Sequence, residues 1–238
     1  VLPGNNDAPH LAELNAELAH QSGKLQVFRL FGESRRQGIF PCGYSLHELE
    51  TPRGDVSLIA ARPCSMGGPE MAFARELERN YGISTLLEST TKLCELVDRA
   101  RSEHVLFVAH NGPHGLGQRE SDPWARDFAV PKEQEETAPW DWGDRDLRDA
   151  IDYAQKMGRR VLGVVAGHMH RRSATDRRPL VRTNAGVTYV NAAVVPRIVS
   201  SAEGRHHHVE LRLNLASPAA AERLVVREHF IPFERNRG

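Results

Sequence analysis

The sequence has few cysteines, no excess of either charge and no long apolar run. Its three cysteines, Cys42, Cys64 and Cys94, are odd in number and lack metal-type spacing, which indicates reduced, structural thiols in an intracellular protein. The 31 Lys and Arg residues are balanced by 31 Asp and Glu residues, which argues against an electrostatic nucleic-acid binder. The longest apolar runs are well short of the roughly 20 residues of a membrane span, and no signal peptide is visible. We therefore expect a cytoplasmic protein with neither nucleic acid nor a membrane as its partner.

The 238 residues are enough for one large α/β domain with a substantial core, and we predict a single domain over 1–238. Most of the chain alternates helical and strand-like segments, whereas its last part reads as three successive strands, which predicts an α/β fold with a mixed sheet. Ser84 is a candidate N-cap for the second of the longer helices. Helices are expected at 10–19, 69–80, 84–101 and 144–157, and strands at 55–61, 104–109, 161–166, 186–192, 207–215 and 223–231.

Three apolar runs end in turns that carry potential metal ligands. The run from Val161 ends in Gly-His168-Met-His170, the run from His104 ends in His110-Asn111-Gly-Pro, and the chain opens with an apolar stub before Gly4-Asn5-Asn6-Asp7. If the backbone stays extended past the strand, His168 and His170 point the same way, at the sheet edge where α/β proteins place ligands. Neutral imidazole is a common ligand of transition metals. The alternative for the His168–His170 pair is a surface loop with two solvated histidines.

These motifs resemble the last three motifs of the calcineurin-like metallophosphoesterases, which run Gly-Asn-His-Asp/Glu, a lone His after a strand, and Gly-His-x-His. The similarity covers nearly the whole chain and points to a bacterial and plant branch of undefined substrate. The resemblance implies an αββα sandwich of two mixed sheets flanked by helices. The further segments that carry it are 61–69, 110–117, 142–147 and 189–197.

Two departures from the family pattern affect the expected chemistry. The family's first two motifs, Asp-x-His and Gly-Asp, belong upstream of Gly4, so we expect a chain that lacks the first βαβ portion and is impaired alone. Asn6 stands where the family usually has a histidine that helps the leaving group depart. Because an amide does not titrate near neutral pH, general-acid catalysis from this position is in doubt.

The resemblance implies a metal-dependent phosphoesterase that hydrolyses a phosphomonoester or phosphodiester with a hydroxide activated by two divalent ions, Mn, Fe or Zn. Asn5, His110 and His168 would hold one ion, and His170 would belong to the other. The substrate would be a small phosphoester. The second hypothesis is a non-catalytic domain that uses the same fold as a binding scaffold, which Asn6 and the missing motifs favour.

Several further residues are candidates for the reaction. His114, four residues after His110, is a candidate replacement for the missing acid, although a loop histidine near the rim is the simpler interpretation. Arg171 and Asn111 are the residues that we predict to contact substrate. The guanidinium of Arg171 can clamp phosphate oxygens. Arg62, Arg172 and Arg197 are further candidates for the same role. The residues 206–208 form a histidine tract for which we favour a structural role.

The long segment 111–141 contains Trp124, Phe128 and Trp140. Long connections without secondary structure are often lids or binding loops, which predicts a substrate-facing cover. The alternative, a packed surface loop whose tryptophans fill the outside of a helix layer, is equally compatible with the sequence.

Overall fold

The computed structural model describes residues 2, 42–126, 128–130, 132–134, 138–172, 178–195, 198–200, 204–219 and 222–233. The helix expected at 10–19 and the turn with Asn5 and Asn6 lie outside these residues.

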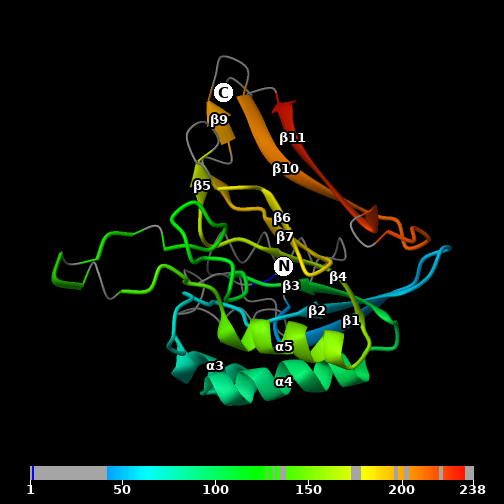
Figure 1. The fold of residues 1–238 in the computed structure, drawn as a ribbon, viewed down its shortest axis with the longest axis horizontal. Coiled ribbons are helices and arrows are strands. Elements are labelled where there is room, and N and C mark those ends of the chain that lie inside the picture. The colour runs from blue at the N-terminus through cyan, green and yellow to red at the C-terminus, as the bar shows by residue number, and fades with distance from the viewer. Residues whose placement is uncertain are drawn as a thin grey trace, which may run out of the picture.

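A six-stranded mixed sheet forms the centre of the fold, in the order β1-β2-β3-β4-β7-β6 (Figure 1). The four inner strands run parallel, and the edge strands β1 and β6 each pair antiparallel with their neighbour. The carboxyl ends of β3 and β4 therefore lie side by side at one edge. The strands are β1 (Ser45–Leu49), β2 (Val56–Ala60), β3 (His104–Val108), β4 (Arg160–Ala166), β6 (Val181–Asn184) and β7 (Val187–Asn191).

Three helices cover one face of this sheet: α3 (Ala74–Tyr81), α4 (Leu86–Arg99) and α5 (Arg145–Lys156) (Figure 1). Leu93 of α4 and Ile151 of α5 are fully buried in one core cluster with Val105 and Phe107 of β3. Alternate residues of β3 thus point toward the helices, as the two-residue period of a strand requires.

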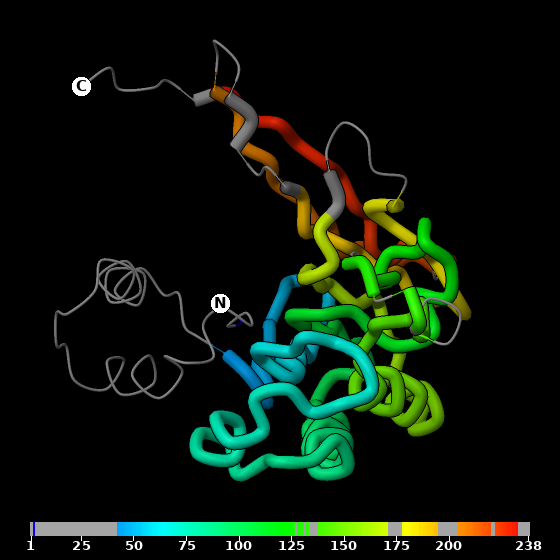
Figure 2. The backbone as a smooth tube through the Cα atoms, turned by 90° about the vertical axis from the view of Figure 1, so that its left-hand side faces the viewer, coloured from blue at the N-terminus to red at the C-terminus, as the bar shows by residue number. Residues whose placement is uncertain are grey.

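The opposite face is covered by a second, three-stranded antiparallel sheet of β9 (Ile198–Ser200), β10 (Gly204–Leu213) and β11 (Leu224–Phe233). Leu106 of β3 is buried here against Leu224. A Cβ at Gly163 would lie 2.4 Å from a methyl carbon of Leu224, so this glycine lets the second sheet approach. Figure 2, turned by 90°, shows the same succession of helices, central sheet and hairpin.

Helix α4 begins with a capping box, one residue later than predicted. Thr85 accepts a hydrogen bond from the N–H of Glu88, and the Glu88 carboxylate accepts one from the N–H of Thr85. Ser84 also donates to the Glu88 carboxylate, at 3.1 Å, but it is not the N-cap. The sequence suggested Ser84 because both residues have cap-forming hydroxyls, and only the backbone geometry distinguishes them.

The other predicted elements within the described residues are confirmed with shifted ends, and the α/β class with a mixed sheet holds. The second predicted helix starts at Ala74 rather than at residue 69. No disulfide joins Cys42, Cys64 and Cys94, which agrees with the predicted reduced thiols. Within the described residues, no helix has the length and apolar character needed to cross a membrane. The short elements that the sequence did not indicate are β5 (Arg171–Arg172), β8 (Val194–Val195) and the 3-10 turn η2 (Lys132–Gln134), together with β1, β6 and β9.

Candidate functional site

His110 and His168 meet at the carboxyl edge of the central sheet. His110 follows β3 by two residues and His168 follows β4 by two residues, and these strands are parallel neighbours. The N–H of Gly167 donates to the carbonyl of His110 at 2.9 Å, which ties the two strand ends together. Parallel pairing therefore joins two histidines that are 58 residues apart in the sequence.

The two imidazole rings face each other through nitrogen atoms. His110 Nε2 lies 3.1 Å from His168 Nδ1, and the rings meet edge to face with centroids 4.8 Å apart. The other nitrogen of His168, Nε2, lies 3.2 Å from the carbonyl oxygen of Met66. Because a carbonyl only accepts, this contact assigns the proton of His168 to Nε2 and leaves a lone pair on Nδ1.

The His110 imidazole is neutral over the physiological range. Burial, and then positive charge at His168, His170 and Arg62, together lower the pKa of His110 from 6.5 to about 3. Burial acts in this direction because it penalises the charged form of a histidine. The neutral form is the one that binds a metal ion, since it keeps a lone pair.

The predicted common direction of the His168 and His170 side chains does not follow from the observed backbone. The prediction assumed an extended backbone, but His168 has φ 62°, in the left-handed region that residues other than glycine rarely adopt. The two-residue alternation therefore does not apply to this pair. His170 still lies near the site, because its charge acts on the pKa of His110.

The donor set among the described residues suits part of a metal site. Two Zn–N bonds of about 2.0–2.1 Å at a near-tetrahedral angle place their nitrogens about 3.3 Å apart. The 3.1 Å between His110 Nε2 and His168 Nδ1 is close to that value, and it is also the length of the direct N–H···N hydrogen bond that joins the two rings here. Among the described residues, no group of three or more His, Cys, Asp and Glu side chains could hold a metal. Asn5, the third predicted ligand of this ion, lies outside the described residues.

Asn111 is completely buried, with 0% of its surface exposed. Its amide nitrogen donates to the carbonyl of Trp142 at 2.8 Å, and no described group pairs with its amide oxygen. The predicted contact with substrate stays a prediction, and in this structure the side chain instead fastens the loop that follows His110.

His114 is partly exposed, at 41%, and its Nε2 lies 3.7 Å from the Asp141 carboxylate. The same carboxylate accepts the N–H of Gly115 at 2.6 Å, so Asp141 shapes the turn that presents His114. This arrangement leaves the predicted proton-donor role open. Arg171 lies in β5, but its side chain is outside what the structure describes, as are the side chains of Arg172 and Arg197.

Arg62 is a buried structural residue and not a phosphate clamp. Only 1% of it is exposed, and its guanidinium lies between two carboxylates, 2.8 Å from Asp144 Oδ1 and 2.9 Å from Asp146 Oδ2. Burial lowers the pKa of Arg62, but the two carboxylates raise it by more, so it stays charged. Burial raises the pKa of Asp144 to about 6 against the opposing effect of Arg62. Ser65 and Asn111 complete the bonds to Asp144.

The long loop is fastened over the site by Trp124. This side chain is fully buried, and its Nε1 donates to the carbonyl of Gly167 at 3.3 Å, next to His168. A Cβ at Gly112 would lie 2.0 Å from the indole, so glycine is required for this packing. Phe128 and Trp140 are 45% and 40% exposed. Trp124 thus belongs to the packed part of the loop, whereas the other two aromatic residues lie at its surface.

Asn191 joins the loop to the histidine turn, and the sequence did not single it out. This buried residue lies at the same edge of the sheet, at the end of β7, and its amide nitrogen donates to the carbonyls of Pro123 and Met169, both at 2.9 Å. Its amide oxygen accepts the N–H of Ala193 at 3.0 Å. The sequence feature that could have identified Asn191 as part of this edge is its place at the end of a predicted apolar strand.

Strand alternation places neighbouring residues of the histidine tract at 206–208 on opposite faces, as predicted. His206 and His208 share one face of β10, with ring centroids 4.2 Å apart. His207 is buried on the other face, where its Nε2 lies 2.8 Å from Glu228.

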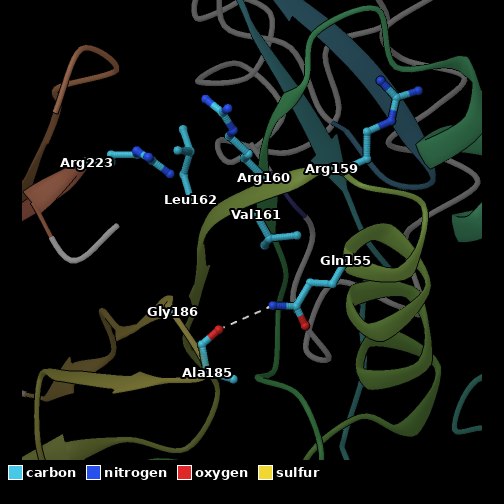
Figure 3. A pocket seen from close by; sticks show the side chains of 8 residues that line it. All are labelled: Gln155, Arg159, Arg160, Val161, Leu162, Ala185, Gly186 and Arg223. Atoms are coloured by element: carbon cyan, nitrogen blue, oxygen red, sulfur yellow. Dashed lines mark hydrogen bonds between the residues drawn. The ribbon is translucent and has the colours of Figure 1, made fainter. Parts of the chain in front are cut away.

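A pocket at the opposite, N-terminal end of β4 gathers Arg159, Arg160 and Arg223 (Figure 3). All three guanidinium groups already have partners. Arg159 and Arg223 donate to main-chain carbonyls at 3.1 and 2.9 Å, and Arg160 lies 3.3 Å from Glu103. The side chains of Arg159 and Arg160 also leave the pocket in different directions in Figure 3. This cluster therefore does not form a convergent anion site.

The sequence matches no family model, and no curated protein matches it. Among solved structures, a hypothetical protein from Thermus thermophilus is similar at 12% identity with a TM-score of 0.35. The similarity covers 79% of this chain and 61% of that protein, so the chain spans less than two thirds of its length.

Proposed function

We propose that the protein is a metal-dependent phosphoesterase with the αββα sandwich of the calcineurin-like metallophosphoesterases. The observation that carries the proposal is the 3.1 Å approach of His110 Nε2 to His168 Nδ1 where β3 and β4 end. The succession of helices, central sheet and second sheet supports it, because it agrees with three of the four layers of such a sandwich. The substrate is a small phosphoester.

His110 and His168 would hold one divalent ion, with Asn5 as a further ligand and His170 directed to a second ion. The ions would supply neutralisation of phosphate charge and activation of water. The carbonyl of Met66 would keep the Nδ1 lone pair of His168 directed at the ion, since it accepts a hydrogen bond from Nε2–H. His114 would protonate the leaving group, and Arg171 would bind the phosphate oxygens.

The second candidate function is a non-catalytic scaffold of the same fold. It is favoured by the donor set, because no third His, Cys, Asp or Glu side chain joins the two histidines among the described residues. Asn6 favours it as well, since this residue occupies the position of the family's proton donor.

Hydrolysis of p-nitrophenyl phosphate and bis(p-nitrophenyl) phosphate with added Mn²⁺ tests the proposal on the full 238-residue chain. His168→Ala should lower turnover by about 100-fold or more. Loss of a residue that only hydrogen-bonds a metal ligand already lowers metal affinity or activity by about 10–100-fold, and this variant removes the ligand itself. The matched control is His47→Ala, which changes an exposed histidine on β1 at the far edge of the sheet. Turnover that survives both His168→Ala and a chelator would refute the enzyme. Turnover by the wild type that both His168→Ala and a chelator abolish would exclude the scaffold.

A further inference from the structure

We propose that Asp144 is a positioning residue that orients both histidines of the site, His110 through Asn111 and His168 through the carbonyl of Met66. The orientation itself follows from the hydrogen bonds described below. Its expected consequence, tighter metal binding, rests on the proposed function.

The first connection joins Asp144 to the segment that follows His110. Asp144 Oδ1 accepts a hydrogen bond from the Asn111 amide nitrogen at 3.4 Å. The main chain adds two stronger bonds: the N–H of Asp144 donates to Gly112 O at 2.7 Å, and the N–H of His114 donates to Asp144 O at 2.9 Å. Asp144 therefore fixes the turn on which His110 depends through its side chain and its backbone together.

The second connection joins Asp144 to the partner of His168. The hydroxyl of Ser65 donates to Asp144 Oδ1 at 2.5 Å and accepts the N–H of Gly67 at 2.9 Å. Met66 lies between these two anchored residues, and its carbonyl oxygen is 3.2 Å from His168 Nε2. Asp144 thereby holds the carbonyl that sets the tautomer of His168.

The loop around Met66 allows little alternative geometry. Gly67 has φ +72°, and a Cβ there would lie 2.0 Å from the carbonyl oxygen of Trp142. The N–H of Gly68 donates to the same oxygen at 3.0 Å. Asn111 donates to this oxygen as well, so both connections from Asp144 meet at Trp142.

Arg62 forms an ion pair with Asp144, and it forms a second ion pair with Asp146. Both carboxylates are 1% exposed, and each pairs with the same guanidinium. Asp146 bonds Ser89 of α4, on the helix side, whereas Asp144 bonds Ser65 and Asn111, on the site side. The chain thus contains a matched control for the serine and aspartate variants of the Asp144 network.

The decisive comparison is Ser65→Ala against Ser89→Ala. Both serines are fully buried and each donates to one of the two carboxylates, so each variant loses one hydroxyl and keeps Arg62 with both of its partners. Asp144→Asn against Asp146→Asn forms a second pair, in which each variant removes one of the two buried negative charges.

The first readout is long-range ¹H–¹⁵N NMR of the imidazole rings in the metal-free protein. Wild type and Ser89→Ala should show His168 as the Nε2–H tautomer. Ser65→Ala should show a mixture of both tautomers, because the Met66 carbonyl is no longer held. Unchanged tautomers in both Ser65→Ala and Asp144→Asn would overturn the proposal, and so would equal changes in the site-side and helix-side variants.

The second readout is the affinity for Zn²⁺, measured by competition with a chromophoric chelator. Only the Zn²⁺ binding that His168→Ala abolishes is assigned to this site. Ser65→Ala and Asp144→Asn should weaken it about 10-fold, the lower end of the effect of losing an outer partner of a ligating histidine. Ser89→Ala and Asp146→Asn should change it less than about twofold. If wild type binds no Zn²⁺ at this site, the phosphoesterase proposal fails, and the tautomer measurement alone decides the role of Asp144.

Discussion

Acidification from about pH 7.5 to about pH 5 should destabilise the protein by about 2 kcal/mol through His110 alone. Its pKa is lowered to about 3, first by burial and then by the charges of His168, His170 and Arg62, whereas a histidine of the unfolded chain titrates near 6.5. Because the folded-state pKa is the lower one, the stabilising contribution is complete above pH 6.5 and is lost as the pH falls toward 3. Between these two pKa values the unfolded chain binds up to one proton more than the folded chain. The free energy of unfolding then falls by about 1.4 kcal/mol for each pH unit of acidification.

Urea unfolding at the two pH values, with a chelator present, measures this effect in wild type and in His110→Gln. Glutamine keeps an amide that can bond His168 but does not titrate, so wild type should lose about 2 kcal/mol more than the variant. Between pH 7.5 and 6.5 the excess should be only about 0.4 kcal/mol, which provides an internal control. Equal losses in the two proteins at pH 5 would refute the argument that folding holds His110 in its neutral form.

Three further substitutions test the loop, the helix cap and the reaction. Gly112→Ala should lower the free energy of unfolding by about 3 kcal/mol in urea denaturation, because its Cβ would lie 2.0 Å from Trp124; a loss below about 1 kcal/mol would contradict this packing. Thr85→Ala should cost about 1 kcal/mol by the same assay and Ser84→Ala clearly less, and the reverse order would contradict the assigned cap. If His114 is the acid, His114→Ala should slow phenyl phosphate by about 10²-fold and p-nitrophenyl phosphate far less, since a basic leaving group needs the proton most; equal slowing would exclude that role.

The approach of His110 and His168 could be predicted from the sequence, because each follows a short apolar run and parallel strands end at the same edge. Their relation to His170 could not. The two-residue period holds only while the backbone stays extended, and His168 departs from it with φ 62°. Histidine is enriched among the non-glycine residues at positive φ, but most histidines do not adopt it, so the residue type alone does not predict this conformation.

The role of Arg62 was also beyond the sequence. A guanidinium that clamps a phosphate and one that is buried between carboxylates look the same in a sequence, because both use the same donors. The pairing of Arg62 with Asp144 spans 82 residues, and the local pattern around Asp144 indicated only the start of a helix. Long-range ion pairs of this kind are decided by how the layers pack, and periodicity carries no information about them.

The fastening of Trp124 also gives the protein an internal optical reporter. Its indole lies in the core while Trp140 is substantially exposed, so the two differ in the polarity that they sense. The indole N–H of Trp124 donates to the carbonyl oxygen of Gly167, just before His168, and a shift of that peptide changes the environment of the chromophore directly. Events at the histidine pair are thereby coupled to the intrinsic fluorescence of the chain, with no label attached.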